Sequence, residues 1–365
     1  MAEAVLRIFA PAWLTRRMEE LNAGPYQWFD SDGNLPVRIA DDEVIGFIPL
    51  SKARIDFYEY ANNVSFDEFG GRVTTAGENK KSFIIPFLGD SMLFGLGVDD
   101  GQTYLSLLGS KSSVRYLNLG IPGSCLAQEI DIIKYRHKDL GSPPLYVFNF
   151  FTGNDFSDLV NYYKKNKGLT EENRPWISPY PFENFLREVN RYFYHNHILK
   201  KSFSVQFFRN QVLYLYNRMC HGQFKDPVFL VMDKNNKDYL SLVRNYLNLQ
   251  LERLNDLSRE LNFKFIFIII PDRHQVYPDL LKLKIPYYGI KEADIDVELP
   301  NRMLKDSLGG IPYIDLLGCL KYRGESLYYI QDNHFTVKGN EAAAECIYPE
   351  LKKYLYEIGR IDIGN

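Results

Sequence analysis

Residues Ser82–Gly97 read SFIIPFLGDSMLFGLG, and the rest of the chain is organised around this segment. Its apolar run, Phe83–Leu88, has the length of one buried strand and breaks at the polar pair Asp90-Ser91 before a glycine-containing turn. Ligand sites in open α/β sheets lie at the carboxyl ends of strands. Ser91 is therefore a candidate for chemistry. The alternative is a strand followed by a tight loop, with Ser91 only capping the next helix.

From this segment onward, apolar runs of strand length alternate with helical patterns. Such alternation predicts βαβ units and an α/β domain with a mostly parallel central sheet. The expected strands are 82–88, 114–119, 145–151, 264–270 and 312–316, and the expected helices are 103–110, 124–137, 237–261, 276–284, 301–308 and 337–358.

Two regions depart from the alternation. Residues 1–80 contain clusters of Pro, Gly, Asn and Asp, and we interpret them as an N-terminal extension that packs on the main domain, 81–365. Leu6–Asn22 has a helical pattern, and short strands are expected within Asp41–Tyr60. Residues 156–236 are rich in Tyr, Phe, Asn, Arg and Lys and contain amphipathic patterns. We interpret them as a helical insertion, and such insertions often form lids or substrate walls.

Composition excludes some functions. The chain has 365 residues, a formal net charge of −3 and 15% aromatic residues. This charge gives no electrostatic argument for nucleic acid as a partner, and the rings suit either a core or a sugar-binding surface. No apolar segment has the length of a membrane span, so we expect a soluble chain of undetermined compartment. Glu3–Pro11 resembles sequence that follows a removed membrane anchor.

The four cysteines are scattered along the chain. Their spacing fits neither a zinc site nor a redox CxxC motif, and we expect buried small hydrophobic residues rather than a disulfide framework. The acidic and histidine residues show no metal-ligand spacing, so no metal and no cofactor are predicted. The cysteines are Cys125, Cys220, Cys319 and Cys346.

Polar residues that follow the expected strands include a full set for acyl transfer. Ser91 supplies a hydroxyl nucleophile, which needs a base to take its proton. His334 is the natural base, and Asp332 can orient its ring and stabilise the imidazolium. The amides of Ser91 and Gly120 and the side chain of Asn154 can donate to an oxyanion. Singly, each has a simpler explanation: a helix-entry glycine, an Asx turn, or a loop aspartate that caps a turn.

Together these residues resemble the four sequence blocks of the SGNH/GDSL superfamily of esterases and acyltransferases. The resemblance covers 82–155 well and 264–355 in outline, and leaves 1–80 and 156–236 outside it. It implies a three-layer α/β/α, flavodoxin-like fold. It also implies Ser91 as nucleophile and oxyanion donor, Gly120 and Asn154 as oxyanion donors, His334 as base and Asp332 as its partner. The matching segments are Phe87–Ser91 with Phe94–Gly97, Leu117–Gly123, Gly153–Asp155, and Asp332–His334 with Gly339.

One departure from the family pattern concerns the last block. Most members have two residues between the aspartate and the histidine, whereas one residue separates Asp332 from His334. This spacing is similar to that of the alginate-acetylation branch, which transfers acetyl groups to exopolysaccharides. The segment Phe267–Tyr277 also resembles that branch, with Arg273 where lysine is frequent. Arg273 and His274 are possible substrate contacts.

The sequence thus predicts a serine-dependent ester hydrolase or O-acetyltransferase acting on a carbohydrate or small ester. The alternative is a catalytically silent glycan-binding protein on the same fold. A nucleotide-binding α/β protein fits less well, because Gly95 and Gly97 lack the context of a phosphate-binding loop. The expected partner is a small-molecule or glycan ester, with no nucleic acid and no membrane span.

Overall fold

A computed structural model gives the structure of the chain. The described part comprises 27–29, 37–38, 48–49, 52–56, 59–74, 84–112, 114–166, 227–288, 291–324, 326–329 and 332–357. The expected helix Leu6–Asn22, the residues 167–226 of the expected insertion, and Cys220 lie outside these residues.

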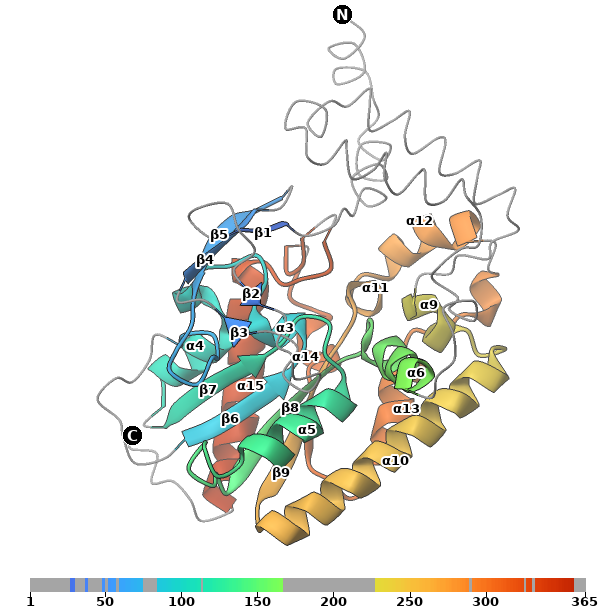
Figure 1. Ribbon diagram of the computed structural model, residues 1–365. Coiled ribbons are helices and arrows are strands. Elements are labelled where there is room, and N and C mark those ends of the chain that lie inside the picture. The colour runs from blue at the N-terminus through green and yellow to red at the C-terminus, as the bar shows by residue number, and fades with distance from the viewer. Residues whose placement is uncertain are drawn as a thin grey trace, which may run out of the picture.

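A five-stranded parallel sheet forms the centre of the molecule (Figure 1). Its strand order is β10-β9-β8-β6-β7, and every neighbouring pair is parallel. This is the flavodoxin-like order. The second strand of the sheet, β7, lies on one side of the first strand, β6, and the later strands are added on the other side. The α/β fold class with a mostly parallel sheet is therefore confirmed. The strands are β6 (Ile84–Gly89), β7 (Arg115–Gly120), β8 (Leu145–Phe151), β9 (Lys264–Ile270) and β10 (Tyr313–Asp315).

Helices cover both faces of this sheet, which gives three layers (Figure 1). One face packs against α4 (Tyr104–Ser110), α14 (Leu317–Leu320) and α15 (Val337–Glu357). The other face packs against a second set of helices. That set is α5 (Leu126–Arg136), α6 (Asp155–Asn166), α10 (Lys237–Leu261) and α13 (Leu299–Leu308).

The strand β9 shows why these segments are central. Six of its seven residues are buried, and successive side chains point to opposite faces of a strand. Ile266, Ile268 and Ile270 accordingly lie in one core, and Phe265 and Phe267 lie in the other. A strand that is apolar on both sides can be covered only between two helical layers, as in parallel sheets generally.

Shorter elements complete the described structure. The helices of this kind that follow β6 in the chain are α3 (Ser91–Phe94), η1 (Asp100–Gln102), α9 (Pro227–Met232), α11 (Arg273–Val276), α12 (Pro278–Tyr288) and η4 (Glu292–Asp294). The expected strands within Asp41–Tyr60 are confirmed by β3 (Ile48–Pro49) and β4 (Lys52–Asp56). β4 pairs antiparallel with β1 (Gln27–Phe29) and β5 (Ala61–Ser65), and β3 pairs with β2 (Val37–Arg38).

The described end of the N-terminal region is bonded to the loop that follows α3. The buried guanidinium of Arg72 donates to the carbonyls of Phe94 at 2.9 Å and Val98 at 2.5 Å, and it pairs with Asp100 at 3.0 Å. The Asn62 side chain also donates to the Val98 carbonyl, at 2.8 Å. Side chains of the N-terminal region thus donate hydrogen bonds to backbone carbonyls at the end of α3 and in the loop that follows it.

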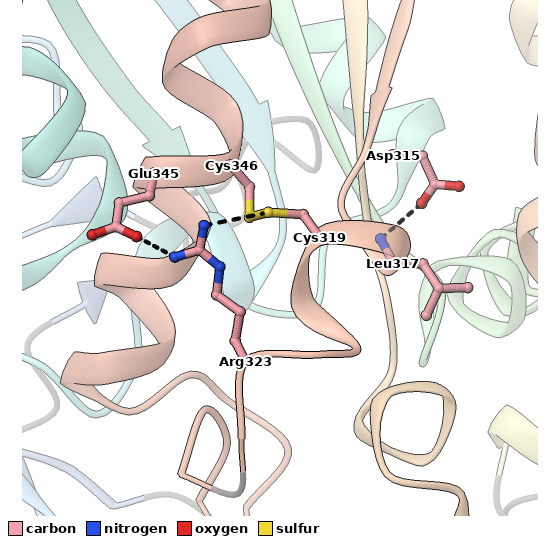
Figure 2. Close-up of a disulfide and its surroundings, with 6 residues drawn as sticks. All are labelled: Asp315, Leu317, Cys319, Arg323, Glu345 and Cys346. Atoms are coloured by element: carbon pink, nitrogen blue, oxygen red, sulfur yellow. Dashed lines mark hydrogen bonds and ion pairs between the residues drawn. A yellow bond between two sulfur atoms is a disulfide. The ribbon is translucent and has the colours of Figure 1, made fainter.

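The prediction for the cysteines is wrong at one pair. Cys319 on α14 and Cys346 on α15 form a disulfide, shown with its neighbours in Figure 2. The two cysteines are 27 positions apart in the sequence, and Asp332 and His334 lie between them. Two cysteines this far apart in sequence meet only because both helices pack on the same face of the sheet. Cys125 is a buried free thiol, as expected.

No helix among the described residues is both long enough and apolar enough to cross a membrane.

Candidate active site

Ser91 lies at the carboxyl end of β6, as the first residue of the short helix α3. Asp90 caps this helix, because its Oδ1 accepts the Met92 N–H at 2.8 Å. Gly95 ends the helix after one turn with φ of 82°, a left-handed conformation suited to glycine. The half-buried Ser91 hydroxyl donates to Asp90 Oδ2 at 3.4 Å. The strand, the cap and the terminating glycine together hold Ser91 at the edge of the sheet.

Asp332 and His334 form a buried pair in the loop before α15. His334 Nδ1 lies 2.8 Å from Asp332 Oδ1, and the two side chains are 8% and 4% exposed. Burial disfavours the imidazolium, but the charge of Asp332 and its hydrogen bond favour it, with a further contribution from Asp90. The outcome is that the pKa of His334 is raised above its ordinary value. This arrangement leaves Nε2 as the ring nitrogen that can accept a proton.

Asp90 connects the serine to this pair. Its fully buried carboxyl contacts the Ser91 hydroxyl and interacts electrostatically with His334. Burial raises the pKa of Asp90, against the opposing effects of the Met92 N–H, of His334 and of hydrogen bonds from Asn154 and Ser91. One carboxyl group therefore interacts with three of the residues that the sequence assigned to the site. The structure brings Ser91, Asn154 and His334 to one edge of the sheet.

Asn154 is close to the serine, but its amide already has an acceptor. Its Nδ2 donates to Asp158 Oδ2 at 2.6 Å, and a hydrogen bond from its side chain also lowers the pKa of Asp90. Burial raises the pKa of Asp158 to about 7. Protonation of Asp158 near neutral pH thus weakens one of the interactions that hold the Asn154 amide.

Gly120 occupies a more enclosed position than expected of an oxyanion donor. Its N–H donates to Asn118 Oδ1 at 3.0 Å, and a Cβ at this position would lie 2.5 Å from the Phe94 backbone nitrogen. Its role as an oxyanion donor stays a prediction. The closeness to α3 explains why this position is a glycine.

Gly123 lies in the loop after β7 and is not among the oxyanion donors expected from the sequence. It is exposed and has φ of 78°, and a Cβ there would meet nothing within 4 Å. Its N–H has no hydrogen-bond acceptor among the described residues. The sequence pattern that would indicate this position as a candidate donor is a glycine followed by a serine between a strand and a helix, Gly123-Ser124.

A second aspartate–histidine pair follows β9. His274 Nδ1 lies 2.5 Å from Asp272 Oδ1, and both side chains are buried. Although burial opposes ionisation, His274 and the hydrogen bonds from His274 and Asn333 hold the pKa of Asp272 well below its usual range. The Asn333 amide reaches Asp272 from the loop that carries His334. The two Asp-x-His motifs are thus joined through one asparagine.

Arg273 of α11 is buried. It is 3% exposed, and its Nη1 donates to the Tyr329 carbonyl at 3.2 Å. His274 is 2% exposed and its ring packs near Phe229 of α9. The substrate contacts predicted for Arg273 and His274 stay predictions.

Other buried carboxyl groups lie near Asp90. Burial raises the pKa values of Glu129 and Asp155 well above the usual range, and the charge of Asp90 raises both further. Ser124 contacts Glu129 at 3.5 Å, and Asp155 accepts the Phe151 N–H at 2.7 Å. Among the described residues, no three His, Cys, Asp or Glu side chains are grouped as metal ligands.

No protein-family model and no curated protein matches the chain. Solved structures similar to it include a lipolytic protein of the G-D-S-L family from Veillonella parvula, 13% identical with a TM-score of 0.39, covering 74% of this chain and all of that one. A lipase from a goat rumen metagenome is 13% identical, covers 73% of this chain and 97% of that one, and has a TM-score of 0.39.

An esterase, EstA, from Pseudoalteromonas sp. is 11% identical, covers 75% of this chain and all of that one, and has a TM-score of 0.36.

Proposed function

We propose that this chain is a serine-dependent O-acyl ester hydrolase or O-acetyltransferase that acts on a carbohydrate or small ester. The observation that carries the proposal is the buried Asp332–His334 pair, linked through Asp90 to the Ser91 hydroxyl at the end of β6. A serine hydroxyl becomes nucleophilic only beside a base, and a histidine held by a carboxylate is such a base.

In the proposed reaction, His334 Nε2 takes the Ser91 proton while Ser91 Oγ attacks the ester carbonyl. The imidazolium is stabilised by Asp332 and then protonates the leaving alcohol, which leaves an acyl group on Ser91. Water or a sugar hydroxyl, activated by His334, then releases the acyl group. The backbone N–H of Ser91 and the Asn154 amide are the proposed oxyanion donors, with Gly120 or Gly123 as a third. One such donor is typically worth about 2.7–4 kcal/mol in the transition state.

Covalent labelling tests this proposal directly. We expect an ethyl phosphonate ester to inactivate the protein and to add one phosphonyl group to the peptide that contains Ser91, as read by mass spectrometry. We also expect the unlabelled protein to hydrolyse 4-nitrophenyl acetate and to release acetate from an acetylated oligosaccharide. The denatured protein is the control, because a serine without its base does not react. Label on another serine, or none, together with an absence of ester turnover, would instead favour the silent glycan-binding alternative.

The raised pKa of His334 predicts the pH dependence of this activity. The base must be neutral to accept a proton, so activity should rise as pH increases through the His334 pKa. We expect the midpoint of the acid limb of kcat/KM to lie above about 6.5, the ordinary histidine value. Asp332→Asn removes the charge that raises the pKa of His334. The acid limb of the activity that remains in this variant should therefore move to lower pH. A limb at or below 6.5 in the unmodified enzyme would contradict the assignment of His334 as the base.

A further inference from the structure

The carboxylate of Asp332 has a partner on each oxygen. Oδ1 faces His334 Nδ1 at 2.8 Å, and Oδ2 accepts the hydroxyl of Tyr60 at 2.7 Å. Tyr60 lies 272 positions earlier in the chain, just before β5. Its neighbour Glu59 accepts the Asp332 backbone N–H at 2.8 Å. Residues of the N-terminal region therefore hold both the side chain and the backbone of the aspartate.

Tyr60 is itself held firmly. Its side chain is 8% exposed and packs with Leu96 and Phe94 of the segment that follows Ser91. Its ring centroid is 4.8 Å from that of Tyr329, whose hydroxyl donates to the Gly97 carbonyl at 2.7 Å. The phenol thus approaches Asp332 from a packed position, and its O–H direction is restricted by the ring.

We propose that Tyr60 is a positioning residue for the active site, which fixes the Asp332 carboxylate so that Oδ1 faces His334 Nδ1. The inference rests on the proposed function, because it assigns Tyr60 a role in the same catalytic group. A carboxylate can rotate about its χ2 bond, because a torsion that ends on an sp² carbon has a broad range of accessible angles. A second hydrogen bond on Oδ2 restricts this rotation. The N–H of His334 then keeps its partner, and the tautomer whose Nε2 can accept the Ser91 proton is maintained.

Several charged and titratable groups surround this pair. Asp90 faces His334, and Glu59 and Tyr329 lie near Asp332. Asp272 and His274 approach through Asn333. None of these contacts includes the Tyr60 hydroxyl, so its removal should leave them in place and change the orientation of Asp332 alone.

Tyr60→Phe tests the proposal, because it keeps the ring and removes the hydroxyl. We expect kcat toward 4-nitrophenyl acetate to fall about 10- to 100-fold with little change in KM, the size of effect that follows when a catalytic group is misplaced. Because Asp332 loses a hydrogen bond in this variant, it should also stabilise the His334 imidazolium less. The acid limb of kcat/KM, and the His334 pKa followed by NMR titration of its ring protons, should both move to lower pH.

Tyr329→Phe is the matched control. It removes a hydroxyl from the same ring pair, but that hydroxyl donates to the Gly97 carbonyl and not to Asp332. We expect its pH limb and the His334 titration to match those of the unmodified protein. A thermal melt of both variants measures any loss of stability.

The NMR titration separates this inference from the proposed function, since it needs no turnover. His334→Gln identifies the resonance. If Tyr60→Phe leaves the His334 pKa and kcat unchanged, or moves the pKa upward, the positioning role is wrong. A lower melting temperature with an unchanged His334 titration would show only a structural role and would also overturn the inference. If Ser91 takes no phosphonyl label and no ester is cleaved while the His334 titration still shifts, the proposed function fails and the Tyr60–Asp332–His334 coupling stands.

Discussion

Replacement of Ser91 by alanine is expected to lower kcat toward 4-nitrophenyl acetate by about 10⁴- to 10⁶-fold, the range seen when a triad serine is removed from a serine hydrolase. The alanine variant has no oxygen to form the acyl-enzyme, so only the oxyanion donors and substrate binding remain. Ser91 is half-buried and its hydroxyl makes one long hydrogen bond, to Asp90 at 3.4 Å. The variant should therefore fold normally, and its thermal melt should be close to that of the unmodified protein.

Two further variants make this experiment sharper. His334→Ala should lose nearly as much activity as Ser91→Ala, and the double variant should lose little more, because members of a triad act as a unit. Ser110→Ala is the matched control, since Ser110 is exposed on α4 and bonds only to the Leu107 carbonyl among described residues. Wild-type activity in Ser91→Ala would refute the assignment. A modest loss in His334→Ala would point to another base, with His274 the first to examine.

The sheet could be predicted from the sequence because its strands are defined locally. The expected bounds of β8, β9 and α10 are those observed, and each is a continuous apolar run or a long amphipathic pattern with clear ends. β6, described over Ile84–Gly89, ends one residue later than expected, since strand pairing with Gly120 continues to Gly89; residues 82 and 83 lie outside the described residues. Pairing partners are not visible in the run itself, so strand ends shift by one or two residues.

The placement of Ser91, Asn154, Asp332 and His334 at one edge also followed from the sequence. Parallel strands end on the same side, so residues after successive strands gather there. The state of each side chain did not follow. Side-chain rotamers and the distance between β6 and its neighbours decide such contacts. Examples are the hydrogen bonds from Asn154 to Asp158 and from the Gly120 N–H to Asn118.

Contacts between distant segments were the least predictable. Tyr60 and Asp332 are 272 residues apart, and a tyrosine in a region without clear periodicity carries no local signal of a role at the site. The Cys319–Cys346 disulfide was missed for the same reason, since a spacing of 27 residues resembles no cysteine motif. Both contacts are created by the packing of segments that the sequence shows only separately.

Opening the Cys319–Cys346 disulfide is expected to lower the free energy of unfolding by about 3–4 kcal/mol. In the chain-entropy account, a cross-link stabilises by restricting the unfolded chain, and the value follows from a closed loop of this length. The segment enclosed by the disulfide contains Asp332 and His334, and the bond itself joins α14 to α15 (Figure 2). The nearby Arg323–Glu345 ion pair is largely exposed, so it replaces little of the lost stability.

Denaturant unfolding with and without a reductant measures this effect, with the double variant Cys319→Ala/Cys346→Ala as the matched control. The unmodified protein should lose stability on reduction, and the double variant should already be destabilised by a similar amount and should not respond to the reductant. Cys125 and Cys220 are present in both proteins, so any response of the double variant to the reductant would come from one of these two cysteines. If reduction leaves the unmodified protein's midpoint and slope unchanged, the disulfide does not restrict the unfolded chain as inferred. The loop with Asp332 and His334 would then be held by noncovalent contacts, which include those with Tyr60, Glu59 and Asp272.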